Sequence, residues 1–258
     1  MKNVLLLSRI ENFYLRLRFN YFKSIASKKS FTDRKLVFSD DFKNLDNFVV
    51  KHNEFYNDND VWFSRDAVSL VPEGVSIKCY KETKTRETWQ GKRMTNWTSG
   101  MIETSGMNGA LKSVLQSKGV WVITSNVCES WIAIWLLKNG RKIEGYDREQ
   151  ITPEIDVMEI INHKMRHTLH YGYADNVYRK YGIGSSIATC DNKFHEFAVE
   201  LLDDGYKFYI DGILTAKFRT TNPEFVTNDP NCLLLNNAAD KHTTENTDFI
   251  IKSVKVYE

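Results

Sequence analysis

Short segments in which hydrophobic and polar residues alternate follow one another along the chain from about residue 35 to its end. They are rich in β-branched and aromatic residues, as β-strands are, and lie at residues 36–42, 74–80, 119–127, 131–137, 154–161, 167–173, 195–202, 206–210, 232–238 and 249–258. Asp204-Gly205 and Asp211-Gly212 flank one segment, a pairing typical of β-hairpins. No long helical pattern follows residue 35. The pattern therefore predicts an all-β fold, a two-sheet antiparallel β-sandwich, rather than alternating strands and helices.

The first thirty residues follow a different pattern. Apolar side chains recur every three or four positions, as on one stripe of an α-helix, at Ile10, Phe13, Tyr14, Leu17, Tyr21 and Ile25. The segment is basic, with Glu11 as its only acidic residue. A surface or partner-binding helix fits this pattern, and so does a helical extension packed on the main domain or a leader with little order. We favour the extension or leader, because basic amphipathic segments are common. We therefore expect an N-terminal extension over residues 1–32 and one β-sandwich domain over residues 33–258.

Length and composition narrow the class of protein. A chain of 258 residues is long enough for one large β-sandwich domain. Its net charge of +2 does not indicate binding to nucleic acid. No stretch approaches the roughly 18 apolar residues of a membrane span, and no clear secretory signal is visible. The four cysteines lack the C-x-x-C spacing of metal or redox sites, so we expect reduced, mostly buried thiols at Cys79, Cys128, Cys190 and Cys232.

The segment Glu154 to Ile161 reads as a strand but contains three carboxylates. Successive side chains of a strand point to opposite faces, so Glu154 and Asp156 share one face. A β-bulge of one extra residue would bring Glu159 to that face and bury Met158. Three explanations fit such a cluster: a solvated strand face paired with Lys or Arg, a calcium site, and a glycoside hydrolase site, which needs two carboxyl groups beside the scissile bond.

Two tryptophans just upstream favour a sugar-binding site. Trp131 and Trp135 share one strand face, with Ala133 between them. Sugar rings stack their C–H faces on aromatic side chains while their hydroxyls bind polar groups. A tryptophan pair alone is more often part of a core; beside three acids the two interpretations have equal weight. Trp97 and Trp121 could form outer sugar subsites but fit a core better.

Glu154-Ile155-Asp156-Val157-Met158-Glu159 resembles the bulged E-x-D-x-x-E signature of glycoside hydrolase family 16, which includes laminarinases, agarases, porphyranases and carrageenases. Flanking segments resemble family strands in the same order over roughly residues 35 to 258: LVFSDDF, WIAIWLL, HTLHYGY, HEFAVELLDDGYKFYIDG, LLLNNAA and IKSVKVYE. The resemblance implies a jelly roll of the concanavalin A type with a concave substrate cleft.

The resemblance also implies a mechanism. Glu154 would be the nucleophile, Glu159 the general acid and base, and Asp156 a residue that orients and tunes them. The implied activity is endo-acting, retaining hydrolysis of a β-linked polysaccharide, either a 1,3-linked or mixed-linkage glucan or a galactan. A non-catalytic lectin-like sandwich and a transglycosylase that uses the same residues remain the alternatives. The implied partner is the polysaccharide, and we expect a monomer that does not bind nucleic acid.

Further positions match the family less closely. The resemblance implies substrate contacts by Trp131, Trp135, His170 and Asn236, although a hydrogen-bonded structural histidine explains His170 equally well. The family commonly has an Asp at the position of Lys252 that helps to bind a structural calcium. A lysine cannot ligate a cation, so we expect no metal and no cofactor. The segment VWVITSNVCES lacks the Glu and Arg of the corresponding family strand, so the sequence does not define the substrate subsites. Sulfated galactans would require a cationic residue in the cleft, and the sequence does not place the candidates, which are Arg93, Arg141, Arg166 and Arg179. The family acts mostly outside the cell, whereas this sequence shows no clear export signal, so its location stays open.

Overall fold

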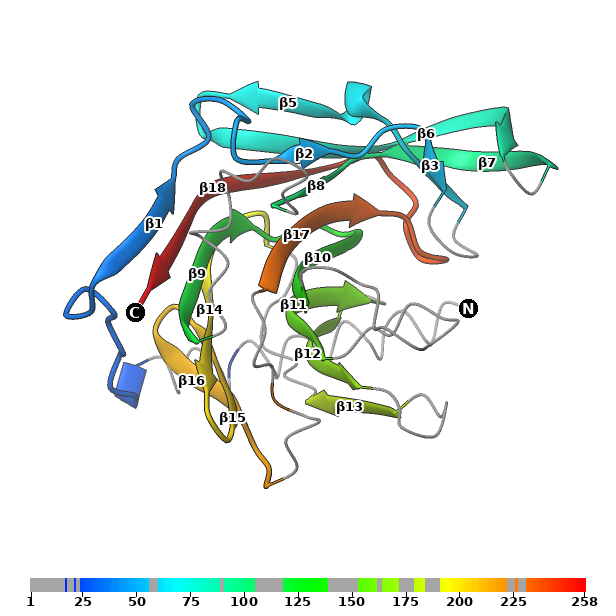
Figure 1. Ribbon diagram of the computed structural model, residues 1–258. Helices are drawn as coiled ribbons and strands as arrows, with labels where there is room; N and C mark the ends of the chain where they lie inside the picture. The colour runs from blue at the N-terminus through cyan, green and yellow to red at the C-terminus, as the bar shows by residue number, and fades with distance from the viewer. Residues whose placement is uncertain are drawn as a thin grey trace.

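The computed structural model describes residues 17, 21, 24–55, 60–88, 91–104, 118–138, 153–161, 164–171, 179–183, 191–221, 226 and 231–258. Two β-sheets pack face to face, as Figure 1 shows. All strand pairs are antiparallel except β4 (Val61–Phe63) with β7 (Gly91–Ser99). The predicted two-sheet antiparallel β-sandwich is confirmed. Within the described residues, no helix is long and apolar enough to span a membrane.

Among the described residues, the larger sheet has eleven strands. Nine of them form the order β16-β15-β14-β9-β18-β6-β7-β4-β3, while β1 pairs with β18 and β5 with β6. The remaining strands of this sheet are β1 (Leu36–Asp40), β3 (Glu54–Phe55), β5 (Val68–Val71), β6 (Gly74–Thr88), β9 (Gly119–Asn126), β14 (Phe194–Leu202), β15 (Gly205–Ile210), β16 (Ile213–Arg219) and β18 (Thr247–Tyr257). One 3-10 turn, η1 (Arg65–Ala67), precedes β5.

The smaller sheet has seven strands in the order β13-β12-β11-β10-β17-β8-β2. Their bounds are β2 (Val49–Val50), β8 (Met101–Glu103), β10 (Trp131–Lys138), β11 (Glu154–Ile161), β12 (Lys164–Tyr171), β13 (Arg179–Ile183) and β17 (Asn231–Ala238). Strand β11, which carries the three acids, lies between β10 and β12 and is therefore supported on both sides.

The main hydrophobic core lies between the two sheets and follows the alternation seen in the sequence. On β9, Trp121 and Ile123 point into this core, whereas Val120 and Val122 belong to a smaller cluster on the outer face of the larger sheet. Trp121 is fully buried, in agreement with the expectation that it belongs to a core. Burial also raises the pKa of the Cys79 thiol to about 12, which makes it unreactive at neutral pH.

The hairpin predicted around residues 206–210 is confirmed as β14, β15 and β16. Ile210 pairs with Ile213, which leaves Asp211 and Gly212 as a two-residue turn with positive φ at both positions. A side chain at Gly212 would lie 2.7 Å from the carbonyl oxygen of Lys29, so this position also requires glycine for close approach of the N-terminal segment.

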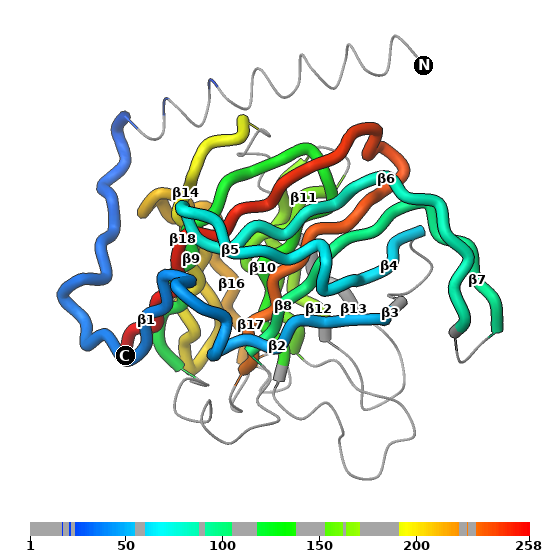
Figure 2. Tube along the Cα trace, turned by 90° about the horizontal axis from the view of Figure 1, so that it is seen from above, coloured from blue at the N-terminus to red at the C-terminus, as the bar shows by residue number. Residues whose placement is uncertain are grey.

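Residues 27–35 form a strap that leads to β1 along the side of the sandwich (Figure 2). Phe31 is 4% exposed and packs edge-on against Tyr209 in the outer cluster. The Lys29 amide donates to the Gly212 carbonyl at 2.8 Å, and Arg34 pairs with the buried carboxylate of Glu200. The domain boundary after residue 32 stays a prediction. These contacts make the strap part of the folded body.

The helix predicted near the N terminus is present at the described positions. Residues 17, 21, 24 and 25 are helical, and Leu17, Tyr21 and Ile25 are at least half exposed. Three members of the predicted apolar stripe, Ile10, Phe13 and Tyr14, lie outside the described residues. The described part of the stripe is therefore not packed into the domain.

Two truncations separate the helix from the strap. Removing residues 1–25 is expected to leave the melting temperature unchanged, because the exposed apolar side chains there contribute little burial. Removing residues 1–32 also deletes Phe31 and is expected to lower the free energy of unfolding by roughly 3 kcal/mol, as loss of a buried Phe side chain does. Denaturant titration of both truncated chains and of Phe31→Ala measures this. Equal stability of the two truncated chains would show that the strap contributes nothing.

Candidate functional site

The three predicted catalytic acids lie on β11, whose register contains a β-bulge between Asp156 and Glu159. Glu154 pairs with His170 and Asp156 with Thr168, whereas Glu159 pairs with Arg166 instead of the Met165 of an unbroken ladder. Val157 and Met158, within the bulge, are both fully buried in the main core. The bulge turns Glu159 onto the face that carries Glu154 and Asp156, which we call the site face. The predicted bulge and the burial of Met158 are confirmed.

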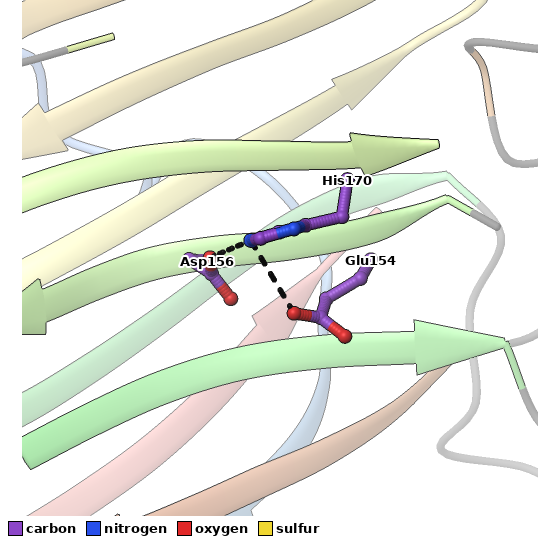
Figure 3. A group of neighbouring side chains, drawn as sticks. All are labelled: Glu154, Asp156 and His170. Atoms are coloured by element: carbon purple, nitrogen blue, oxygen red, sulfur yellow. Dashed lines mark hydrogen bonds and ion pairs between the residues drawn. The ribbon is translucent and has the colours of Figure 1, made fainter. Parts of the chain in front are cut away.

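His170 joins the first two acids from the neighbouring strand β12, as Figure 3 shows. Its Nε2 lies 2.9 Å from Asp156 Oδ2 and 3.5 Å from Glu154 Oε1. An ionised carboxylate only accepts hydrogen bonds, so Nε2 carries the proton and donates to Asp156. The side chains of Glu154 and His170 are 15% and 12% exposed, whereas that of Asp156 is 5% exposed. The structure therefore brings His170 to the acids and leaves Glu154 partly exposed. The substrate contact predicted for His170 stays a prediction.

Glu159 is held from the other side by β10. Trp131 Nε1 donates to Glu159 Oε1 at 2.8 Å, while Oε2 is buried and has no hydrogen-bond partner among the described residues. Buried polar atoms in folded proteins nearly always have a partner, which is often water or a ligand. Among the described residues, Glu159 Oε2 therefore lacks the partner that such an atom normally has.

Trp135 and Asn236 contact each other rather than the acids. Trp135 Nε1 donates to Asn236 Oδ1 at 2.8 Å, and both residues are buried on the site face. Trp135 also belongs to a second hydrophobic cluster that includes Trp97 and Ala133, so Trp97 too lies in a core. Of the predicted sugar-binding tryptophans, Trp131 is the partly exposed one. The substrate contacts predicted for Trp135 and Asn236 stay predictions.

Two residues that the sequence named, Ala133 and Arg166, lie beside Glu159 on the site face, a position that depends on strand register. Ala133 lies between Asn236 and Glu159 in one row across the sheet, and Arg166 continues that row beyond Glu159. Arg166 was one of the four cationic candidates that the sequence did not place. Extending the pairing of Glu154 with His170 along both strands, with one extra residue for the bulge, would have placed it opposite Glu159. Arg141 lies outside the described residues.

Glu154, Asp156 and His170 each offer one ligand atom, and these atoms lie within 4.8 Å of one another, so the group could hold a metal ion. In the structure, His170 Nε2 instead lies within hydrogen-bond distance of Asp156, 2.9 Å from Oδ2. Lys252, at the position where the family commonly has a calcium-binding Asp, is exposed on β18 with its ammonium 5.9 Å from the centre of the Phe194 ring.

Chelation tests both positions at once. EDTA is expected to leave the melting temperature and any glycan hydrolysis unchanged, because Lys252 carries a positive charge where the family resemblance implies a calcium-binding Asp. Calorimetry and a reducing-sugar assay with and without EDTA measure this. A fall in melting temperature that calcium reverses would show that an ion binds through other ligands.

The sequence matches no known family model and no curated protein. Solved structures are similar over most of the chain. An endo-β-1,3-glucanase from Pyrococcus furiosus has a TM-score of 0.69 at 20% identity and covers 91% of this chain and 98% of its own. The laminarinase catalytic domain from Thermotoga maritima has a TM-score of 0.66 at 19% identity, covering 87% and 98%. A family 16 endo-glucanase from Bacteroides ovatus has a TM-score of 0.66 at 15% identity, covering 85% and 99%. At these identities the likeness shows the fold, and it agrees with the architecture that the family resemblance implied.

Proposed function

We propose that this chain is a member of glycoside hydrolase family 16 and an endo-acting, retaining hydrolase of a β-linked polysaccharide. One observation carries the proposal: the bulge in β11 places Glu159 on the same face as Glu154 and Asp156. A bulge at this point disrupts the ladder and buries two consecutive residues, Val157 and Met158, on the opposite side. Two glutamates on one face, with an aspartate between them, match the pair of carboxyl groups that glycoside hydrolysis requires.

In this proposal Glu154 attacks the anomeric carbon and forms a covalent glycosyl-enzyme intermediate. It is the most exposed of the three acids, as a nucleophile for a polymer must be. Asp156 accepts a hydrogen bond from His170 Nε2, which also lies near Glu154, so His170 and Asp156 together orient the carboxylate of Glu154. Retention requires the two reacting carboxyl groups to lie roughly 5–5.5 Å apart around the bound sugar.

Glu159 protonates the leaving oxygen in the first step and removes a proton from water in the second. The Trp131 indole fixes one oxygen of its carboxyl group, which leaves Oε2 as the atom that exchanges the proton. The glycosidic oxygen is the polar partner that the buried Oε2 lacks. Beside it, the partly exposed Trp131 offers an apolar surface on which a sugar ring can stack.

The similar solved structures favour a β-1,3-linked or mixed-linkage glucan as the substrate, with a galactan as the second choice. Their printed descriptions name a laminarinase, an endo-β-1,3-glucanase and an endo-glucanase. Incubation with β-1,3-glucan, mixed-linkage β-glucan and neutral and sulfated galactans, followed by detection of new reducing ends, tests the proposal.

An endo-acting enzyme is expected to release oligosaccharides of several lengths, and NMR of the first products is expected to show the β-anomer. Release of the α-anomer would contradict retention. Binding of glycans without cleavage of any polysaccharide in the panel would support a lectin-like function instead. Longer products from an added acceptor would indicate transglycosylation.

A further inference from the structure

The β-bulge that positions Glu159 leaves part of the backbone of β11 without strand partners. In the strand register, no residue of β10 and no residue of β12 is paired with Val157. Its side chain is fully buried in the core between the sheets. A buried backbone carbonyl outside a regular ladder needs another hydrogen-bond donor, because leaving it unsatisfied is costly.

His167 supplies this donor from the neighbouring strand β12. Its Nδ1 lies 2.6 Å from the carbonyl oxygen of Val157, and the residue is fully buried. A carbonyl oxygen only accepts, so Nδ1 carries a proton. Burial lowers the pKa of His167 to about 4, so the ring is neutral at pH 7 and Nε2 is an acceptor.

The other side of the ring is anchored in the larger sheet. Thr215 Oγ1 on β16 lies 2.9 Å from Nε2 and 3.1 Å from the carbonyl oxygen of Phe208. The imidazole stacks on Phe208 of β15 with 4.7 Å between ring centres and 23° between ring planes. His167 thus connects the bulge to two strands of the opposite sheet.

We propose that His167 is a positioning residue that keeps the β11 bulge in place and thereby holds Glu159 on the site face. The inference rests on the proposed role of Glu159 as acid and base. If the His167 donor is lost, the buried Val157 carbonyl oxygen has no hydrogen-bond donor. A return of β11 to a regular ladder would supply a backbone amide in its place. A one-residue slip turns the side chains beyond it to the other face. Glu159 follows the bulge and would be displaced, whereas Glu154 and Asp156 precede it and would stay.

Two substitutions separate the hydrogen bond from packing. His167→Leu fills similar space without a donor. His167→Asn places an amide nitrogen near the position of Nδ1 and so keeps the donor while losing the ring. Leu169→Ala serves as the control, because Leu169 is a buried core residue on the same face of β12 and pairs with Ile155 instead of the bulge.

The kinetic readout is the dependence on the leaving group. On polysaccharide, His167→Leu is expected to lower kcat roughly 10²–10³-fold with little change in KM, as loss of general acid catalysis does. On an aryl glycoside with a good leaving group, formation of the glycosyl-enzyme is expected to stay within a few-fold of wild type, because Glu154 is undisturbed. His167→Asn is expected to recover most of the activity. An equal loss on both substrates, as expected of Leu169→Ala, would make His167 a packing residue and overturn the proposal.

A measurement without turnover keeps this inference separate from the proposed function. NMR of the 13C-labelled glutamate side chains at one fixed pH follows the chemical shift of the Glu159 carboxyl carbon in folded protein. This chemical shift is expected to change in His167→Leu and to return towards wild type in His167→Asn. An unchanged chemical shift in His167→Leu would overturn the positioning role even if the wild-type protein hydrolysed no glycan. If only the proposed function were wrong, the wild-type protein would hydrolyse no glycan, while the NMR signal of Glu159 would still change in His167→Leu and recover in His167→Asn.

Discussion

Replacement of Glu154 by alanine is expected to lower hydrolysis of the polysaccharide by roughly 10⁴-fold or more, as removal of a catalytic nucleophile does in other enzymes. Glu154 is partly exposed on the site face, so its truncation opens no cavity in the core and the protein should fold as the wild type does. Azide is expected to restore turnover of an activated β-glycoside and to give the α-glycosyl azide, because the small anion attacks from the side that the carboxylate vacated. Product NMR and kinetics with increasing azide measure this.

A matched control is Glu196→Ala. Glu196 is also a strand glutamate, but it lies on β14 of the other sheet, where burial raises its pKa and its backbone amide donates to Asp211. This variant is expected to keep wild-type activity and to show no response to azide. Full activity of Glu154→Ala would show that Glu154 is not the nucleophile. Rescue with retained configuration would also contradict it.

Replacement of Glu159 by alanine is expected to have an effect that depends on the leaving group. On polysaccharide, kcat should fall roughly 10²–10⁴-fold, because the glycosidic oxygen then leaves without a proton. On a dinitrophenyl glycoside, the first step needs no protonation and should stay fast, while attack of water slows for lack of a base. The covalent intermediate on Glu154 should therefore accumulate and be visible by mass spectrometry of the intact protein.

The control for this prediction is Trp131→Phe. The substitution removes the indole donor to Glu159 Oε1 but keeps the carboxyl group and an aromatic face. It is expected to show the same leaving-group dependence with a smaller loss than Glu159→Ala. If Glu159→Ala lowered the activity on both substrates equally and no covalent intermediate formed, Glu159 would not be the general acid and base.

Local features of the sequence were enough to predict the strands, the hairpin and the bulge. Side chains alternate across a strand whatever its neighbours are, so the order of residues from Glu154 to Glu159 already indicated one extra residue and the burial of Met158. Asp211-Gly212 likewise predicted its turn, because few residue pairs accept positive φ at both positions.

The sequence by itself determined the β-sandwich and the identity of the three acids, since both depend on residues a few positions apart. The tertiary structure decided what surrounds them. Trp131 meets Glu159, Arg166 lies opposite it, and His167 reaches the bulge, all through the register between separate strands. The packing of Phe31 on the outer face joins segments still farther apart. A register that shifts by one residue exchanges the two faces of a strand, so contacts of this kind depend on how whole strands align, which local residue patterns do not specify.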